Sequence, residues 1–385
     1  MKQVYGYFMS PVNLMGAGAV EEIGDQLKKL KGTKALIVTD EDLVELGIVE
    51  EVTEHIKKVG IDFVVFDGVQ PNPTVSNVEA GLELLEEENC DIVVSVGGGS
   101  PHDCAKGIAI VATNGGEITD YEGLDQSTEP MMPLISVNTT AGTASEMTRF
   151  AVITDEERQV KMAIADWRVT PNVAINDPLL MMKKPPALTA ATGMDALTHA
   201  VEAYVSTDAT PVTDSAAIKA IELVAENLRE AVANGDNFEA RDNMAYAEFL
   251  AGMAFNNASL GFVHAMAHQL GGFYDLPHGV CNAILLPHVE GFNLIANPGR
   301  LADIAETMGE NIEELSTRAA ADKALEAITT LSKDIGIPQR LSDLEGVKKE
   351  DFDTLAENAL KDVCSSTNPR KATKEEIIGI FESAY

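Results

Sequence analysis

The stretch VVSVGGGSPHDCAKGIAIVA, residues 93–112, contains the pattern that decides the fold of the first half of the chain. A β-branched run leads into three adjacent glycines and then into a helical stretch. Glycines let a backbone approach an anion closely, and the start of a helix offers unpaired N–H groups. A tight strand-to-helix turn without a ligand is the simpler interpretation, but three glycines exceed what a turn needs. We therefore predict a phosphate-binding loop in which Ser100 is the helix N-cap, Pro101 the first helical residue and Asp103 part of a capping box.

Similar β-branched runs alternate with helical stretches through the rest of the first half. Amphipathic segments such as 42–59 and 75–89 lie between these runs. Continuous Val/Ile runs separated by helices are typical of a parallel sheet covered on both faces. We therefore predict an α/β domain with a Rossmann-like parallel sheet, whose expected strands are residues 34–40, 61–67, 91–99, 133–138 and 171–177.

The character of the sequence changes near KKPPALTAATG, residues 183–193. Beyond this stretch the strand signals vanish, and Ala/Leu/Glu-rich helical periodicity continues to the C-terminus. A length of 385 residues also favours two domains over one. We predict an α/β domain over residues 1–184 and an all-helical domain over residues 185–385.

The charge balance limits the classes of partner. The chain has 61 Asp and Glu against 28 Lys and Arg, a net charge of −33, which repels polyanions. We expect neither nucleic acid nor a membrane as a partner. No apolar run approaches the roughly 20 residues that cross a bilayer, no export signal is evident, and four scattered cysteines are typical of reduced thiols. These features favour a cytoplasmic protein.

Two further stretches bear on nucleotide binding. NTTAGTASEMT, residues 138–148, follows an expected strand and places five hydroxyl side chains around one glycine, which suits a pyrophosphate or a ribose. MGAGAVEEIG, residues 15–24, resembles the dinucleotide fingerprint, but Glu21 takes the third glycine position and we expect no strand of suitable length before it. Any nucleotide fold is therefore a variant. Asp40, at the end of an expected strand, is equally consistent with a ribose contact and with a helix N-cap.

Five potential metal ligands lie in two clusters of the helical half. Asp195 and His199 are four residues apart, as are His264 and His268, so each pair shares a helix face, and His278 follows. Coincidence is improbable because the whole chain has seven histidines. One carboxylate and several imidazoles favour zinc, iron or manganese over magnesium or calcium. The absence of H-E-x-x-H argues against a zinc protease, and the spacing favours a metal that polarises a bound oxygen.

These motifs, in this order, resemble the iron-containing, or group III, alcohol dehydrogenases. The resemblance rests on GGGSPHD, TTAGTASE, GMDALTHAVEAY and HAMAHQLGGFYDLPHGVCNAILLPH and extends over essentially the whole chain. It implies the dehydroquinate synthase-like fold of that family. Within the family, the chain is most similar to bacterial NAD-dependent enzymes that act on short-chain primary alcohols.

The resemblance also implies roles for individual residues. Fe(II), or zinc or another divalent metal, would be held by Asp195, His199, His264 and His278, and His268 would be a catalytic histidine beside the nicotinamide. NAD would be bound by Asp40, Asn72, Gly98, Gly99, Ser100, Thr139, Thr140, Thr148 and Lys161. The expected substrate is a small alcohol or aldehyde, and the expected assembly is a homodimer or a larger homo-oligomer.

Other functions remain possible at this stage. A glycerol dehydrogenase or a dehydroquinate synthase would use a related scaffold with zinc and a polar pocket. The apolar Phe255 and Leu260 near the motifs argue mildly against such a substrate. A metal-dependent phosphoester hydrolase would need a second metal or a base that the motifs do not supply, and a non-catalytic metal module would leave both phosphate-type loops without a role.

Overall fold

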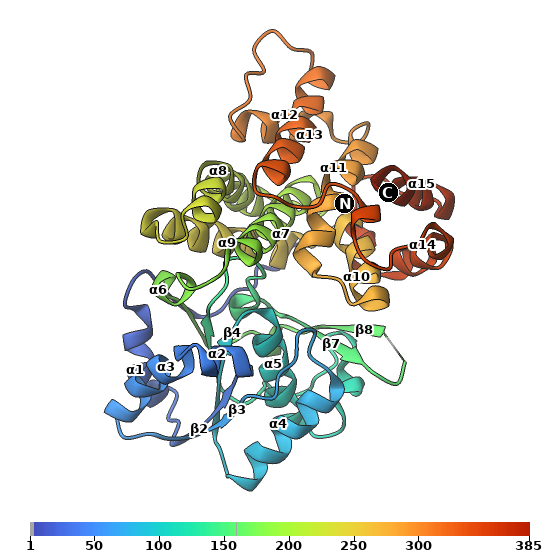
Figure 1. The fold of residues 1–385 in the computed structure, drawn as a ribbon. Coiled ribbons are helices and arrows are strands. Elements are labelled where there is room, and N and C mark those ends of the chain that lie inside the picture. The colour runs from blue at the N-terminus through green and yellow to red at the C-terminus, as the bar shows by residue number, and fades with distance from the viewer. Residues whose placement is uncertain (1–3, 159) are drawn as a thin grey trace. The chain divides into compact units, whose positions relative to one another are not determined.

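The computed structural model describes residues 4–158 and 160–385. The chain divides into two compact units (Figure 1). Unit 1 consists of the described residues up to Thr140 together with Ala144–Met182, and unit 2 consists of Ala141–Thr143 together with Lys183–Tyr385. The main division falls two residues before the expected one, and three residues of the second candidate loop group with the helical unit.

The central element of unit 1 is a sheet of six parallel strands. All five expected strands are present, and the sixth, β1, is an addition at the edge. The strand order across the sheet is β1 (Val12–Met15), β9 (Val173–Asn176), β6 (Leu134–Asn138), β4 (Ile92–Gly97), β2 (Lys34–Val38) and β3 (Asp62–Phe66). The sequence analysis expected no strand of suitable length before Gly16, and the strand found there, β1, has only four residues and pairs with β9.

Helices cover both faces of this sheet, as the Val/Ile runs predict. Leu36 and Val38 of β2 belong to the hydrophobic core shared with α4 (Val75–Glu87) and α5 (Gly99–Asn114). Their neighbour Ile37 points the other way, into a core that contains residues of α1 (Ile23–Lys29) and α3 (Ile48–Lys58). This alternation places apolar side chains on both sides of one strand.

Two local features of unit 1 differ from the expectation. The segment 42–59 is not one helix but two, α2 (Glu41–Glu45) and α3, because Gly47 adopts a left-handed φ of 72° between them. A second sheet also lies in this unit, with β7 (Phe150–Asp155) and β8 (Val160–Ala165) antiparallel and the short β5 (Gly123–Leu124) beside β8. The sequence analysis missed these strands, since they have alternating burial rather than a continuous apolar run.

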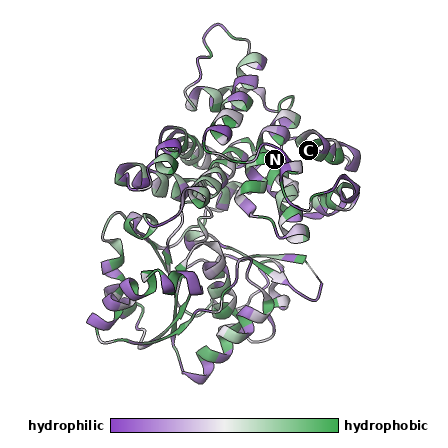
Figure 2. Cartoon of the chain, viewed as in Figure 1, coloured by the Kyte–Doolittle hydropathy of each residue, from purple (hydrophilic) through white to green (hydrophobic). Residues whose placement is uncertain are grey.

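Unit 2 is helical, and its residues 183–385 contain no strand. The long helix α7 (Pro186–Val205) is buried on almost every side and packs against α8 (Pro211–Ala233), α9 (Phe238–Ala258) and α11 (His278–Asn293). Its many alanines allow this close packing. Figure 2 shows hydrophilic and hydrophobic residues alternating along the helices of unit 2, as expected for amphipathic helices around a shared core.

The remaining helices of unit 2 complete that core. They are α10 (Phe262–Tyr274), α12 (Pro298–Thr307), α13 (Thr317–Asp334), α14 (Phe352–Lys361) and α15 (Lys374–Ala384), while the four-residue α6 (Pro178–Met181) ends unit 1. Among the helices in the described part of the chain, none combines the length and apolarity needed to cross a bilayer.

Candidate metal centre and nucleotide-binding loops

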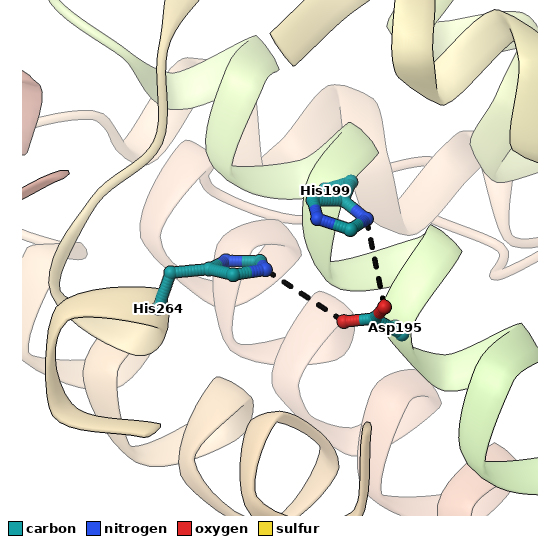
Figure 3. A group of neighbouring side chains, drawn as sticks. All are labelled: Asp195, His199 and His264. Atoms are coloured by element: carbon teal, nitrogen blue, oxygen red, sulfur yellow. Dashed lines mark ion pairs between the residues drawn. The ribbon is translucent and has the colours of Figure 1, made fainter. Parts of the chain in front are cut away.

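Three helices of unit 2 carry the predicted metal ligands. Helix α7 supplies Asp195 and His199, one turn apart on the same face, as their spacing predicts. Helix α10 supplies His264, and α11 begins at His278. Figure 3 shows the side chains of Asp195, His199 and His264 pointing toward one another.

The donor atoms of these residues converge. Asp195 Oδ1 lies 3.7 Å from His264 Nε2 and 3.5 Å from His278 Nε2, and Asp195 Oδ2 lies 4.0 Å from His199 Nδ1. Ligand atoms held about 2.1 Å from one tetrahedral ion are separated by roughly 3.4 Å. The donor atoms of Asp195, His199 and His264 all lie within 4.8 Å of one another, which fits one shared divalent cation, and His278 reaches Asp195.

The charge states also suit a cation. Burial alone would raise the pKa of Asp195, but the charges of His199 and His278 and a hydrogen bond from His264 hold it well below its usual range. Burial lowers the pKa of His199 to about 3, so its ring is neutral at physiological pH. Its buried Nδ1 has no hydrogen-bond partner among the described residues, which is costly unless an ion takes its lone pair.

His264 is oriented by a residue that the sequence analysis did not single out. Glu202, on α7, places Oε2 2.5 Å from His264 Nδ1, and both side chains are buried. Burial opposes protonation of His264, but the charge of Glu202 and the contacts with Asp195 raise its pKa to about 9. The imidazole therefore lies between two carboxylates.

Asn282 is a second contact that the sequence analysis missed. Its Nδ2 lies 2.7 Å from Asp195 Oδ1, 3.1 Å from His264 Nε2 and 3.0 Å from His278 Nε2. Asn282 follows His278 by four residues on α11, so helix periodicity could have placed it beside the ligands. Asn282 therefore contacts three of the four proposed ligand residues through one side-chain nitrogen.

His268 lies beside this donor group. Its Nδ1 is 2.9 Å from Asp362 Oδ2, and its ring stacks on His278 with centroids 5.4 Å apart. Asp362 is also the N-cap of the 3₁₀ helix Val363–Thr367. Burial would raise the pKa of Asp362, yet the charge and hydrogen bond of His268 lower it below its ordinary value. The histidine ring is thus fixed at one nitrogen by an ionised carboxylate.

The loops predicted to bind the cofactor follow neighbouring strands of unit 1. Asp40 follows β2, Gly98 follows β4 and Thr139 follows β6, and these three strands are adjacent in the sheet. The strand order reverses at β2, which has β3 on one side and β4 on the other. Ligands of open α/β sheets bind at such switch points, beyond the carboxyl ends of the strands.

The glycine loop differs in detail from the prediction. The N-cap of α5 is Gly98 rather than Ser100, and it makes no side-chain cap. Asp103 does not close a capping box, because its carboxylate accepts hydrogen bonds from Ser145 Oγ at 2.6 Å and from the Val152 N–H at 3.0 Å. The N-cap itself therefore supplies no side chain to the first N–H groups of α5, and phosphate binding at this helix start stays a prediction.

The remaining predicted cofactor residues make contacts within unit 1. Thr140 lies against the glycine loop, since a Cβ on Gly98 would come within 2.9 Å of Thr140 Oγ1. Lys161, on β8, donates to Asn72 Oδ1 at 2.7 Å. Asp40 caps α2 by accepting from the Leu43 N–H at 2.8 Å, and Thr148 is buried beside the Lys106 ammonium. The structure thus confirms the N-cap interpretation of Asp40, while the ribose contact stays a prediction.

A doubly covered parallel sheet with a glycine-rich loop after β4, together with a helical unit that brings a carboxylate and three imidazoles together, is the arrangement that the sequence analysis expected of a metal-dependent oxidoreductase. Comparison with known proteins gives the family. The model for iron-containing alcohol dehydrogenases matches residues 11–178, and the model for the C-terminal part of the same family matches residues 189–385. The chain belongs to the iron-containing alcohol dehydrogenase family.

Individual relatives extend over the whole chain. The chain is 59% identical to a 1,3-propanediol dehydrogenase of Citrobacter freundii, with 100% of this chain and 99% of the relative covered. It is 51% identical to an NAD-dependent methanol dehydrogenase of Bacillus methanolicus, with 98% and 99% covered. A solved structure of a 1,3-propanediol oxidoreductase matches with a TM-score of 0.98 and 58% identity over all of both chains. The predicted family and fold class are confirmed.

Proposed function

We propose that this protein is an NAD-dependent, divalent-metal alcohol dehydrogenase that interconverts short-chain primary alcohols and their aldehydes. The observation that carries the proposal is the convergence of Asp195, His199, His264 and His278 in a chain of this family. The names of the relatives support short alcohols as substrates and NAD as the cofactor of at least one relative. Iron is the metal that we propose for the cell.

The four ligands would hold the metal, and the bound metal supplies a Lewis acid for the alcohol or carbonyl oxygen, while NAD supplies the hydride acceptor. The chain's own residues prepare this chemistry. His199 stays neutral because it is buried, so its lone pair remains available. Glu202 and Asn282 hold the other donors in place.

We assign the proton transfer to His268. Asp362 accepts from its Nδ1, so the second ring nitrogen is the one that exchanges a proton with substrate or solvent. Phe255 stacks on His199 with ring centroids 4.2 Å apart, and this apolar wall beside the metal ligands suits a short alkyl chain. The NAD contacts in unit 1, the cytoplasmic location and the homo-oligomeric state stay predictions.

The test measures NADH formation from 1-propanol, 1,3-propanediol and methanol by the purified chain. The enzyme is first stripped with a chelator, and Fe(II) or Zn(II) is then returned separately under anaerobic conditions. Restoration by Fe(II) is the expected result. If only Zn(II) restores activity, the proposed metal is wrong and the proposed reaction stands. If neither metal gives alcohol-dependent NADH formation, the proposed function is refuted.

A further inference from the structure

We propose that Glu202 is a positioning residue of the metal centre, because it fixes both the tautomer of His264 and the start of the helix that carries it. This inference rests on the proposed metal-binding role of His264. Glu202 itself touches neither the metal donors of Asp195 nor those of His278 in the contacts described above. It acts through His264.

The two carboxylate oxygens of Glu202 have separate partners. Oε2 lies 2.5 Å from His264 Nδ1, and Oε1 accepts a hydrogen bond from the Val263 N–H at 2.7 Å. An ionised carboxylate has no proton to give, so His264 Nδ1 must be the donor. With Nδ1 held as the donor to Glu202, Nε2 is the nitrogen that would give its lone pair to a bound metal, and Nε2 is the atom that faces Asp195 Oδ1.

The same carboxylate completes the N-terminus of α10. The N-cap of this helix is Gly261, which has no side chain to cap the first N–H groups. Glu202 takes the Val263 N–H, and Asn368 Oδ1 takes the Phe262 N–H at 3.2 Å. Both caps come from distant parts of the sequence, and the positive end of the helix dipole favours the negative charge of Glu202.

The close approach of these caps explains why residue 261 is a glycine. A Cβ at Gly261 would lie 2.9 Å from Glu202 Oε1 and 2.8 Å from Asn368 Oδ1. Both distances are shorter than real Cβ contacts, so any side chain would displace the two caps. The sequence Gly-Phe-Val-His therefore allows the backbone of α10 and the ring of His264 to contact the same carboxylate, that of Glu202.

Glu290 provides a matched control. It is as deeply buried as Glu202, on α11 of the same unit, and burial and the charge of Glu202 raise its pKa to about 8. Its Oε1 accepts from Asn293 Nδ2 at 3.4 Å, and none of its hydrogen bonds among the described residues reaches a metal ligand. Replacing either glutamate by glutamine removes one ionisable group from the core without changing its size.

The experiment compares Glu202→Gln and Glu290→Gln with the parent chain. Zn(II) affinity is measured on the stripped full-length proteins by competition with a chromogenic chelator, and bound metal is counted by mass spectrometry. We expect Glu202→Gln to weaken Zn(II) binding by about 10- to 100-fold, because glutamine has one acceptor for two N–H groups. Glu290→Gln should bind within about twofold of the parent.

Equal Zn(II) affinity in a folded Glu202→Gln variant would overturn the inference, as would an equal loss in both variants. If Glu202→Gln does not fold, ¹⁵N-histidine NMR of the zinc-loaded parent decides, with His264→Gln identifying the resonance. A proton on Nδ1 of His264 supports the inference, and a proton on Nε2 refutes it. A parent that binds no divalent metal would instead refute the proposed function, so the two failures are distinguishable.

Discussion

The two units build their candidate sites by opposite means. Unit 1 uses the backbone at the ends of β2, β4 and β6, where glycines and uncapped N–H groups suit an anion. Unit 2 uses side chains inside α7, α10 and α11, where buried carboxylates and imidazoles suit a cation. The first kind of site depends on a few consecutive residues, whereas the second depends on how distant helices pack. Substitutions should therefore act locally in unit 1 and through packing in unit 2.

The largest expected effect separates two histidines one turn apart on α10. His264→Ala should lose both the metal and activity, by about a thousandfold or more, since a Lewis acid supplies several kcal/mol. His268→Ala should keep the metal and lose turnover, because His268 pairs with Asp362 rather than with Asp195. Metal content and kcat, measured on the same preparations, check both expectations.

Retention of metal by His264→Ala would contradict its assignment as a ligand. Loss of metal from His268→Ala would show that both histidines hold the ion.

The next effect tests whether packing alone controls the site in unit 2. A Cβ on Gly279, beside His278, would lie 2.2 Å from the backbone oxygen of Ala191 on α7. Gly279→Ala should therefore push α11 away from α7 and weaken Zn(II) binding by about 10- to 100-fold, the loss found when groups that orient metal ligands are disturbed. Chelator competition measures this change.

Gly291→Ala is the control in the same helix, because a Cβ there meets only Leu325 Cδ1 at an ordinary 3.6 Å. Equal metal affinity in both variants would mean that the contact between α7 and α11 does not set the ligand geometry.

A smaller effect is expected in unit 1, at Asp40. Asp40→Asn keeps a capping side chain for α2 but removes the charge, so it should raise the preference for NADP over NAD by about tenfold, or 1.4 kcal/mol, with little change in melting temperature. Asp40→Ala should shift cofactor preference similarly and also destabilise the protein by about 1 kcal/mol. The ratio of kcat/KM for the two cofactors and thermal melts check this. An unchanged cofactor ratio in both variants would leave Asp40 with the capping role alone.

The last expected effect concerns the pH and a buried carboxyl group in unit 2. The pKa of Glu290 is raised from 4.5 to about 8, so the folded state holds a proton that the unfolded state releases between these values. Stability from this group is complete below about pH 4.5 and is lost as the pH rises toward 8, by at most about 1.4 kcal/mol per pH unit. Relative to Glu290→Gln, the parent's melting temperature should fall between pH 5 and pH 8. If the melting temperatures of the two proteins instead change with pH in the same way, Glu290 is already ionised in the folded protein at pH 5.

The sequence contained most of the fold because unit 1 follows simple periodicities. Continuous Val/Ile runs predicted five of the six parallel strands, and the change near residue 183 predicted the helical half. The edge strand β1 and the hairpin of β7 and β8 were missed, since short or alternating strands resemble loops. Ser100 was misassigned as a cap because capping patterns ignore how Asp103 is used by Ser145 and Val152.

The sequence predicted the metal ligands of the site but not the residues that orient them. Asp195 and His199 share a helix face by spacing alone. Glu202 stands in the same motif, yet its partner His264 is 62 residues away, and Asp362 is 94 residues from His268. Such pairs arise from packing, and no local pattern contains them.

The three residues Ala141–Thr143 group with unit 2, although the residues on both sides of them in the sequence belong to unit 1. The backbone of Gly142 forms a hydrogen bond with the ring of His199, and a Cβ on Gly142 would lie 2.8 Å from Thr192 Cβ on α7. Thr140, in the loop proposed for the cofactor, is two residues away, so the chain between them spans at most about 7 Å. Two residues of backbone therefore separate a residue proposed to contact the cofactor from a residue that contacts a proposed metal ligand.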